Sequence, residues 1–305
     1  MRQGNLDQAE EYFNGALHVT PKTAPVLSML ANVAQKRGDL GKALKLYQEA
    51  LDSDPKLIKA ALGLGKILLQ SKRYEDARQV LVAALKYNPN SNEVRILLSR
   101  ILQKMDRSGE AIDNIKKLLD RDSSSWSAYY FKALIHLQCQ EYDQAIRDAN
   151  NSLRIQPDNP RATMCLSQAL IETEQYKKAI HVLRDVLAEN PDMWNAKMQL
   201  ARAYFSHGDL EEAKALLNKM AAGRRGLGPV HFLMGEVLEA QGHLSLAVVE
   251  YEAGVLHSER LTEESPQLKE FVDKEMPLHE KISEFKKIVK QAQKKGFDSG
   301  SDDFE

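Results

Sequence analysis

The stretch GDLGKALKLYQEALDSDP, Gly38 to Pro55, is restated along the chain with a fixed period of 34 residues. Steps of 34 residues in either direction from Ala43 always meet an alanine: Ala9, Ala43, Ala77, Ala111, Ala145, Ala179, Ala213 and Ala247. Four residues after each alanine comes a large apolar residue, with Ala149 as the single exception. A fixed period of this length indicates a stack of small structural units rather than separate globular domains.

Each complete copy predicts two amphipathic helices joined by a tight turn. In residues 24–55, apolar residues recur at helical spacing on both sides of Gly38-Asp39. Asp39 is expected to cap the second helix, and Pro55 ends the unit because its ring cannot continue a helix. Two helices this short cannot bury their apolar faces alone, so the copies are expected to stack.

A second column of residues supports this geometry. Twelve residues before each repeat alanine, the residue is always small: Ala31, Gly65, Ser99, Ala133, Ser167, Ala201 and Gly235. A small residue on both helices allows two backbones to approach closely. An enlarged residue at such a crossing, such as Ala145→Leu, is expected to overpack it at a cost of ~1–3 kcal/mol.

At these residues the chain resembles the tetratricopeptide repeat family, over roughly residues 4–258. The resemblance implies an all-α, right-handed superhelical solenoid of antiparallel helix pairs with a C-terminal capping helix. Three features depart from the family pattern: the fourth unit closes with Ser123 instead of proline, Ala149 occupies the aromatic slot, and residues 221–229 contain three glycines.

The repeat phase predicts three segments. Residues 1–258 form the solenoid, whose first repeat is truncated to its second helix; the expectation is a fragment or alternative start, or a first helix covered by a partner. Residues 259–295 form a capping helix region, because Leu278, Ile282, Phe285 and Val289 make one apolar stripe. The alternative for this stripe is a partner-binding helix. Residues 296–305 are acidic and are expected to be disordered.

Composition narrows the class of protein. The 305 residues contain 42 Lys and Arg against 43 Asp and Glu, so no overall field favours nucleic acid or an anionic membrane. Cys139 and Cys165 are the only cysteines, which favours a reducing compartment. No apolar run approaches the ~18 residues of a membrane span. The expectation is an intracellular, cytoplasmic protein, with the nucleus as an alternative location.

No catalytic motif stands out. The segment GLGK, Gly63 to Lys66, resembles part of a phosphate loop, but the repeat phase places it inside a helix whose amides are already bonded. His136 and Cys139 lack a third metal ligand, since a zinc site needs at least three protein ligands. His136 is instead expected to be a core histidine with satisfied hydrogen bonds. We therefore predict a non-enzyme without metal or cofactor.

The predicted function lies on the first helices of the pairs, which line the concave face in the resembled architecture. Methionines suit adaptable binding surfaces and aromatics anchor interfaces. The predicted peptide-binding groove consists of Met29, Asn32, Leu62, Lys66, Leu97, Arg100, Tyr130, Phe131, Met164, Gln168, Met198, Arg202, Phe232 and Glu236. Lys66 and Arg100 make its early half basic, while Glu236 makes its late end acidic. We expect a bound peptide whose acidic end lies toward Lys66 and Arg100.

Three functional hypotheses follow. The first is a scaffold or adaptor that binds a partner protein's peptide or helix, as a subunit of a multiprotein complex. The second is the non-catalytic repeat region of a larger enzyme, such as a glycosyltransferase. The third is an RNA-associated factor that uses the lysines between residues 281 and 295. Some members of the resembled family bind acidic chaperone tails through a clamp of basic residues, but here Ser28, Glu93 and Leu97 replace clamp positions.

Overall fold

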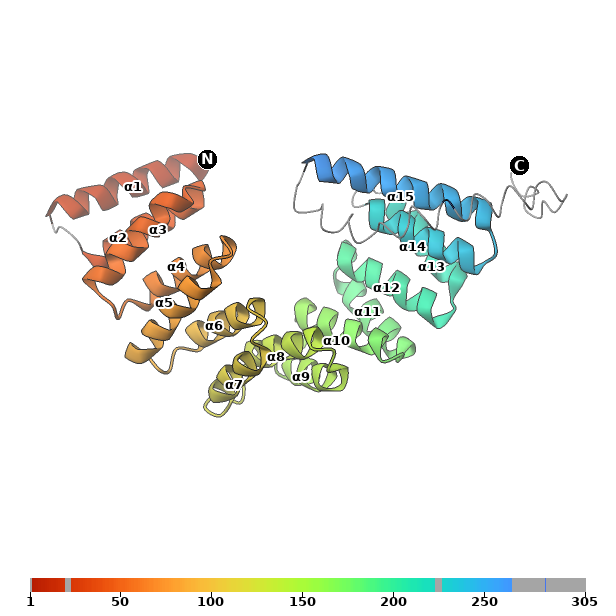
Figure 1. Cartoon of the computed structure of the whole chain (residues 1–305), viewed down its shortest axis with the longest axis horizontal. Helices are drawn as coiled ribbons and strands as arrows, with labels where there is room; N and C mark the ends of the chain where they lie inside the picture. Colours follow the sequence, from red (N-terminus) through yellow and green to blue (C-terminus); the bar gives the residue numbers. More distant parts are fainter. Residues whose placement is uncertain (1, 20–22, 223–226, 265–282, 284–305) are drawn as a thin grey trace. The chain divides into compact units, whose positions relative to one another are not determined.

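The computed structural model describes residues 2–19, 23–222, 227–264 and 283 (Figure 1). All regular structure in these ranges is α-helical. The helices are α1 (Arg2–Val19), α2 (Ala24–Arg37), α3 (Leu40–Ser53), α4 (Ile58–Gln70), α5 (Tyr74–Tyr87), α6 (Asn92–Lys104), α7 (Ser108–Leu119), α8 (Trp126–Gln138), α9 (Tyr142–Ile155), α10 (Pro160–Glu172), α11 (Tyr176–Glu189), α12 (Trp194–His207), α13 (Leu210–Ala221), α14 (Leu227–Ala240) and α15 (Leu244–Glu264). The predicted all-α class is confirmed.

From α2 onward the helices form consecutive pairs, α2 with α3 and so on to α14 with α15. We call the first helix of each pair helix A and the second helix B, and α1 is the helix B of the truncated first repeat. The chain divides into two compact units, Met1–Cys165 and Leu166–Glu305, which we name unit 1 and unit 2. In unit 1 each helix A contacts the next helix A, from α2 through α4 and α6 to α8. Contacts between successive helices B of this unit do not occur within the described residues. Helices A therefore line the inner face of unit 1.

Both predicted columns of small residues lie in the core. The repeat alanines from Ala43 to Ala247 are fully buried, and every member of the small column is buried as well. Gly65 shows how close the packing is, because a Cβ atom there would lie 3.1 Å from Cδ2 of Leu81. Gly235 meets the ring of Tyr251 in the same way, at 2.5 Å. The small residues of helix A thus leave room for the large apolar side chain of helix B, so the backbone of helix A lies close to that side chain.

The turn between helix A and helix B has the same backbone conformation in every complete repeat. Gly38, Gly208 and Gly242 have positive φ angles, and so do four residues other than glycine at the same repeat position: Lys72, Asp106, Gln140 and Glu174. At the first of these turns, the amide of Gly38 donates to Gln35 O and that of Asp39 donates to Ala34 O. The left-handed residue satisfies the last carbonyls of helix A. The carboxylate of Asp39 then accepts from the amide of Lys42, which confirms the predicted cap.

Several other expectations can be compared with the helices. The segment Gly63 to Lys66 lies inside α4, as predicted. The last described helix, α15, extends to Glu264, beyond the predicted end of the solenoid at residue 258. The predicted apolar stripe and lysines of residues 278–295 and the acidic tail of residues 296–305 lie outside the described residues, apart from Ser283. The capping helix and the RNA hypothesis therefore remain predictions.

Candidate functional site

An arginine and two aromatic residues meet on the inner face of unit 1. The guanidinium carbon of Arg100, on α6, lies 5.6 Å from the ring centroid of Phe131, on α8. The ring centroids of Phe131 and Tyr130 are 5.0 Å apart, with the planes inclined by 55°. A guanidinium within about 6 Å of an aromatic centroid is attracted by the ring. Arg100 and Phe131 together form a flat, amphipathic surface that extends over two adjacent repeats.

The electrostatic surroundings of this cluster are positive. Burial raises the pKa of the Tyr130 hydroxyl, and the nearby charges of Arg161 and Arg100 act in the opposite direction. Both arginines are exposed, as is Lys66, which occupies on α4 the repeat position of Arg100. Glu93, at the start of α6, is an exposed acidic residue on the same helix as Arg100. The charged side chains that act on the Tyr130 hydroxyl are therefore the two basic ones, Arg161 and Arg100.

The earliest part of this face is held by hydrogen bonds. Tyr47 on α3 donates its hydroxyl to Oδ1 of Asn32 at 2.9 Å, and Asn32 donates from Nδ2 to the carbonyl of Ser28 at 2.8 Å. Burial raises the pKa of Tyr47 to about 12, so its hydroxyl remains a donor at neutral pH. These two hydrogen bonds hold the Asn32 side chain in one orientation, although the residue remains exposed to solvent. Met29 is also exposed, at 46% of its surface, one helical turn away.

The structure places the remaining predicted residues of unit 1 at different depths. Leu62 and Met164 are half-buried. Leu97 is 4% exposed and belongs to the hydrophobic core, so it offers no surface to a ligand. Its repeat position faces solvent at Met29 but packs inward at Leu97, because α6 lies between α4 and α8. The exposed part of the predicted groove in unit 1 is therefore narrower than the sequence predicted.

Unit 2 carries the other predicted residues. Gln168 and Arg202 are exposed, and Met198 and Glu236 are half-buried. Phe232 is used in packing within its own helix pair, because a Cβ atom on Gly254 of α15 would lie 2.5 Å from the Phe232 ring. These residues are less clearly gathered into a cluster than those of unit 1.

Sequence reasoning missed Arg161, which belongs to the first turn of α10. Its repeat position carries Pro25, Lys59, Glu93 and Ser127 in the earlier copies, so neither a charge nor its sign is constant at this position. Its charge acts on the Tyr130 hydroxyl and lowers the pKa of that group, an effect between two helices that spacing alone does not reveal.

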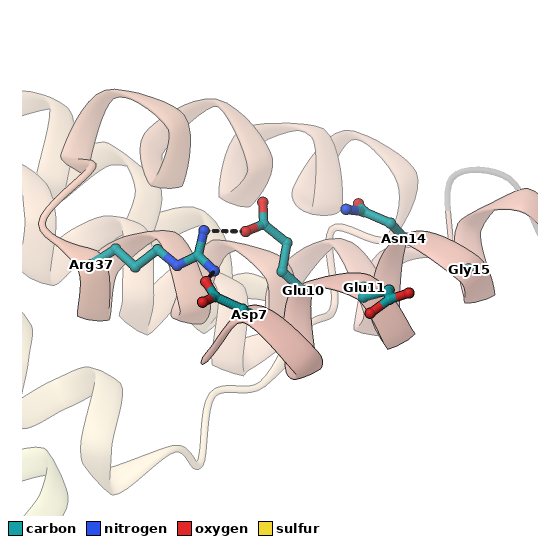
Figure 2. Close-up of a pocket in the computed structure, with 6 residues that line it drawn as sticks. All are labelled: Asp7, Glu10, Glu11, Asn14, Gly15 and Arg37. Carbon is teal, nitrogen blue, oxygen red and sulfur yellow. Dashed lines mark hydrogen bonds and ion pairs between the residues drawn. The ribbon is translucent and has the colours of Figure 1, made fainter. Parts of the chain in front are cut away.

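An acidic hollow lies at the first helix and serves a structural role. Figure 2 shows Asp7 and Glu10 of α1 next to Arg37 of α2, with Glu11, Asn14 and Gly15 further along α1. Arg37 forms ion pairs with Asp7 and Glu10, and Lys42 of α3 lies 2.6 Å from Glu10. The hydrogen bond from Lys42 is the main reason that the pKa of Glu10 is lowered. These ion pairs connect α1 to the pair formed by α2 and α3.

The predicted core histidine is confirmed. His136 is 5% exposed; its Nδ1 lies 2.5 Å from Glu141 Oε2, and its Nε2 lies 3.4 Å from Asp148 Oδ2. Within the described residues, no three His, Cys, Asp or Glu side chains are placed to share a metal ion. No helix among the described segments has the length and apolar character needed to cross a membrane.

The clamp positions of the chaperone-binding relatives are unsuited to that role here. Ser28 and Leu97 are both 4% exposed and lie within the packed layers. Neither side chain carries a positive charge, and neither reaches solvent to meet a carboxylate. The inner face of unit 1 therefore presents a different set of contacts, centred on Arg100 and Phe131.

Comparisons with known proteins agree with the repeat architecture. One sequence model of the tetratricopeptide repeat matches residues 34–101 and 170–226, and a second matches residues 1–58 and 96–160. The chain is 25% identical over 190 residues to protein O-mannosyl-transferase TMTC1 of Homo sapiens, which covers 61% of this chain and 21% of that protein. It is 23% identical over 209 residues to the BBSome complex member BBS4 of Bos taurus, which covers 68% of this chain and 40% of that protein.

The chain thus spans about a fifth and two fifths of the length of these two relatives. A crystal structure of a tetratricopeptide repeat protein from Parabacteroides merdae superposes with a TM-score of 0.64 at 18% identity. The superposition covers 82% of this chain and 98% of that one, which supports the fold. With its recurrent small columns, paired helices and matching sequence models, the chain belongs to the tetratricopeptide repeat family.

Proposed function

We propose that this chain is a protein-interaction scaffold and that the inner face of unit 1 binds an acidic, partly apolar peptide or helix of another protein. The observation that carries the proposal is the cluster of Arg100, Tyr130 and Phe131. Arginine and tyrosine are enriched among the residues that contribute most to protein interfaces. The charge of Arg161 acts on Tyr130 as well, and the exposed Lys66 occupies on α4 the repeat position that Arg100 has on α6.

The chemistry of the cluster defines the ligand. The guanidinium of Arg100 can form two parallel hydrogen bonds with a carboxylate while its flat face stays on Phe131. The exposed edges of Tyr130 and Phe131 favour an apolar or aromatic side chain a few residues further along the ligand. Asn32, held by Tyr47, can hydrogen-bond the ligand backbone with little loss of side-chain entropy.

Charge reversal tests this proposal. Twelve-residue peptides would be selected by phage display on the wild-type chain, and the binding of a selected peptide would be measured by fluorescence anisotropy at 50 mM salt. We expect Asp and Glu to be enriched among the selected peptides. Lys66→Glu/Arg100→Glu is expected to weaken binding by at least tenfold, because two favourable charge contacts become repulsive.

A matched control separates this effect from net charge. Lys45→Glu/Lys86→Glu reverses two exposed charges on helices B, α3 and α5, and should leave affinity within about twofold, because long-range effects between exposed charges are screened. Equal affinity of wild type and Lys66→Glu/Arg100→Glu would rule out the inner face of unit 1 as the acidic-peptide site.

A second candidate is the non-catalytic repeat region of a larger enzyme. The specific observation in its favour is the similarity to protein O-mannosyl-transferase TMTC1, over 61% of this chain but only 21% of that protein. Under this candidate the repeats hold a substrate protein or a partner for a catalytic domain elsewhere. Full-length transcript sequencing decides the matter, since an in-frame catalytic domain would support it and its absence would favour a separate scaffold.

A further inference from the structure

Two arginines within residues 92–125 meet at one backbone carbonyl. Arg95 of α6 donates from Nη2 to the carbonyl oxygen of Pro89 at 2.9 Å. Arg121, two residues after the end of α7, donates from Nη1 to the same oxygen at 3.4 Å. Pro89 belongs to the loop between α5 and α6. The two guanidiniums are therefore neighbours at the end of the helix pair where helix B connects to the next helix A.

Arg95 is held in place by α7. Its Nη1 donates to Oδ1 of Asn114 at 3.0 Å, and Asn114, which is 9% exposed, donates in turn to the carbonyl of Arg95 and to Oγ of Ser99. Nε of Arg95 is buried and lacks a hydrogen-bond partner among the described residues. Burial lowers the pKa of Arg95, and the charge of Arg121 lowers that pKa further. An arginine nevertheless stays charged in a protein, so the structure holds a partly desolvated cation in a fixed position.

No carboxylate compensates this pair of charges. Within the part of the chain that the structure describes, neither Arg95 nor Arg121 forms an ion pair. Asp122 follows Arg121 in the sequence, but its two oxygens accept hydrogen bonds from Asn92 and Ser124. One arginine would be enough to hold the carbonyl of Pro89, and a second like charge beside it is unfavourable by itself. An anion next to both guanidiniums would remove this repulsion.

Comparison of the copies shows that the arginine pair is particular to residues 92–125. No other complete copy has an arginine at either position, so stacking does not require the pair. In the last copy, the positions of Arg95, Asn114 and Arg121 are filled by His231, Glu250 and His257. The two histidine rings stack with centroids 5.2 Å apart, and Nδ1 of His231 lies 2.6 Å from Oε2 of Glu250. That copy thus carries its own carboxylate at the position where residues 92–125 have the neutral Asn114.

We propose that Arg95 and Arg121 bind a doubly charged phosphate group, that of inorganic phosphate or of a phosphorylated side chain. The planar fork of a guanidinium matches two oxygens of a phosphate. A phosphate monoester carries a charge of about −1.5 to −2 at neutral pH and therefore balances both arginines, whereas one carboxylate balances only one. Arg95 and Arg100 lie five residues apart on α6, which separates them by about 140° around the helix. The phosphate site is therefore distinct from the peptide-binding face proposed above.

The dependence of stability on phosphate tests this site in the full chain. At constant ionic strength, we expect inorganic phosphate to raise the midpoint of urea denaturation of the wild type, because a ligand that binds only the folded state stabilises it. Arg121→Gln replaces an exposed side chain and should lose most of this shift. The matched control is Arg147→Gln, at an exposed position of α9, which should keep the full shift. An absent shift in the wild type, a shift retained by Arg121→Gln, or a shift lost in Arg100→Gln instead would overturn the proposal.

Calorimetry distinguishes the two sources of the phosphate group. The probes are inorganic phosphate, an alanine–phosphoserine–alanine tripeptide with blocked ends, and the same tripeptide without phosphate. Tighter binding of the phosphorylated tripeptide than of inorganic phosphate would assign the site to a phosphorylated side chain, and the opposite order would assign it to the free ion. In both cases Arg121→Gln should weaken binding at least tenfold, because half of the positive charge at the site is removed. Equal binding of the phosphorylated and unphosphorylated tripeptides would contradict recognition of phosphate.

Discussion

One backbone position in each repeat requires a left-handed conformation. It is Gly38 in the first complete copy and Gln140 in the fourth complete one, with φ angles of 87° and 60°. A residue with a Cβ atom costs about 1–2 kcal/mol in this region, and only glycine occupies it freely. The protein accepts this cost in four copies, because the left-handed residue ends helix A and directs the chain into helix B.

Substitutions at this position should therefore have opposite signs in different copies. Gln140→Gly is expected to raise the free energy of unfolding by ~0.5 kcal/mol, since the relief of strain exceeds the added flexibility of the unfolded chain. Gly38→Ala should lower it by ~1 kcal/mol. Urea denaturation followed by circular dichroism measures both. Gly109→Ala, inside α7 with open space around the added methyl group, is the control and should be neutral or stabilising. A loss of stability in Gln140→Gly would contradict this explanation.

At the scale of elements, the pair formed by α8 and α9 differs from its neighbours. Lys132 Nζ lies 3.1 Å from Asp148 Oδ1, and the other oxygen of Asp148 faces His136. The positions of Lys132 and His136 are leucine in both adjacent copies, as Leu98 and Leu102 and again as Leu166 and Leu170. Asp148 is 5% exposed, and its two carboxylate oxygens are the buried partners of Lys132 and His136 inside a layer that is otherwise apolar.

Removal of Asp148 should be more harmful than removal of the whole cluster. Asp148→Ala leaves Lys132 and His136 without their buried partner and is expected to cost ~3 kcal/mol, whereas Lys132→Leu/His136→Leu/Asp148→Val should be close to neutral. Urea denaturation of both variants gives the comparison. If the triple variant is the less stable of the two, this expectation is wrong, and the three polar side chains stabilise the α8–α9 pair more than apolar side chains at the same positions do.

The sequence predicted most of the elements because the repeat alanines and small residues occur at fixed spacing. It identified His136 as a core residue but not its partner Asp148, since a contact between two helices depends on their rotation. It also included Leu97 in the groove, because periodicity gives the face of a helix but not how deeply a neighbour covers it.

At the scale of the whole molecule, regular packing and variable surface are separated by repeat position. Positions that recur, such as Ala43 and its copies, are buried and carry the fold. Positions that vary, such as Lys66, Arg100 and Leu246, lie at the surface and distinguish one repeat from another. The two units keep the same packing rules, while the arginine–aromatic cluster of Arg100, Tyr130 and Phe131 occurs in unit 1.

The central claim is that the inner face of unit 1 binds a partner peptide, and hydrogen exchange with and without a selected acidic peptide tests it most directly. We predict slower exchange in helices A of unit 1, chiefly α4, α6 and α8, with the largest change near Arg100 and Tyr130. Helices α3, α5 and α7 should be unaffected and serve as internal controls. Slower exchange confined to those helices B, or to unit 2, would contradict the claim.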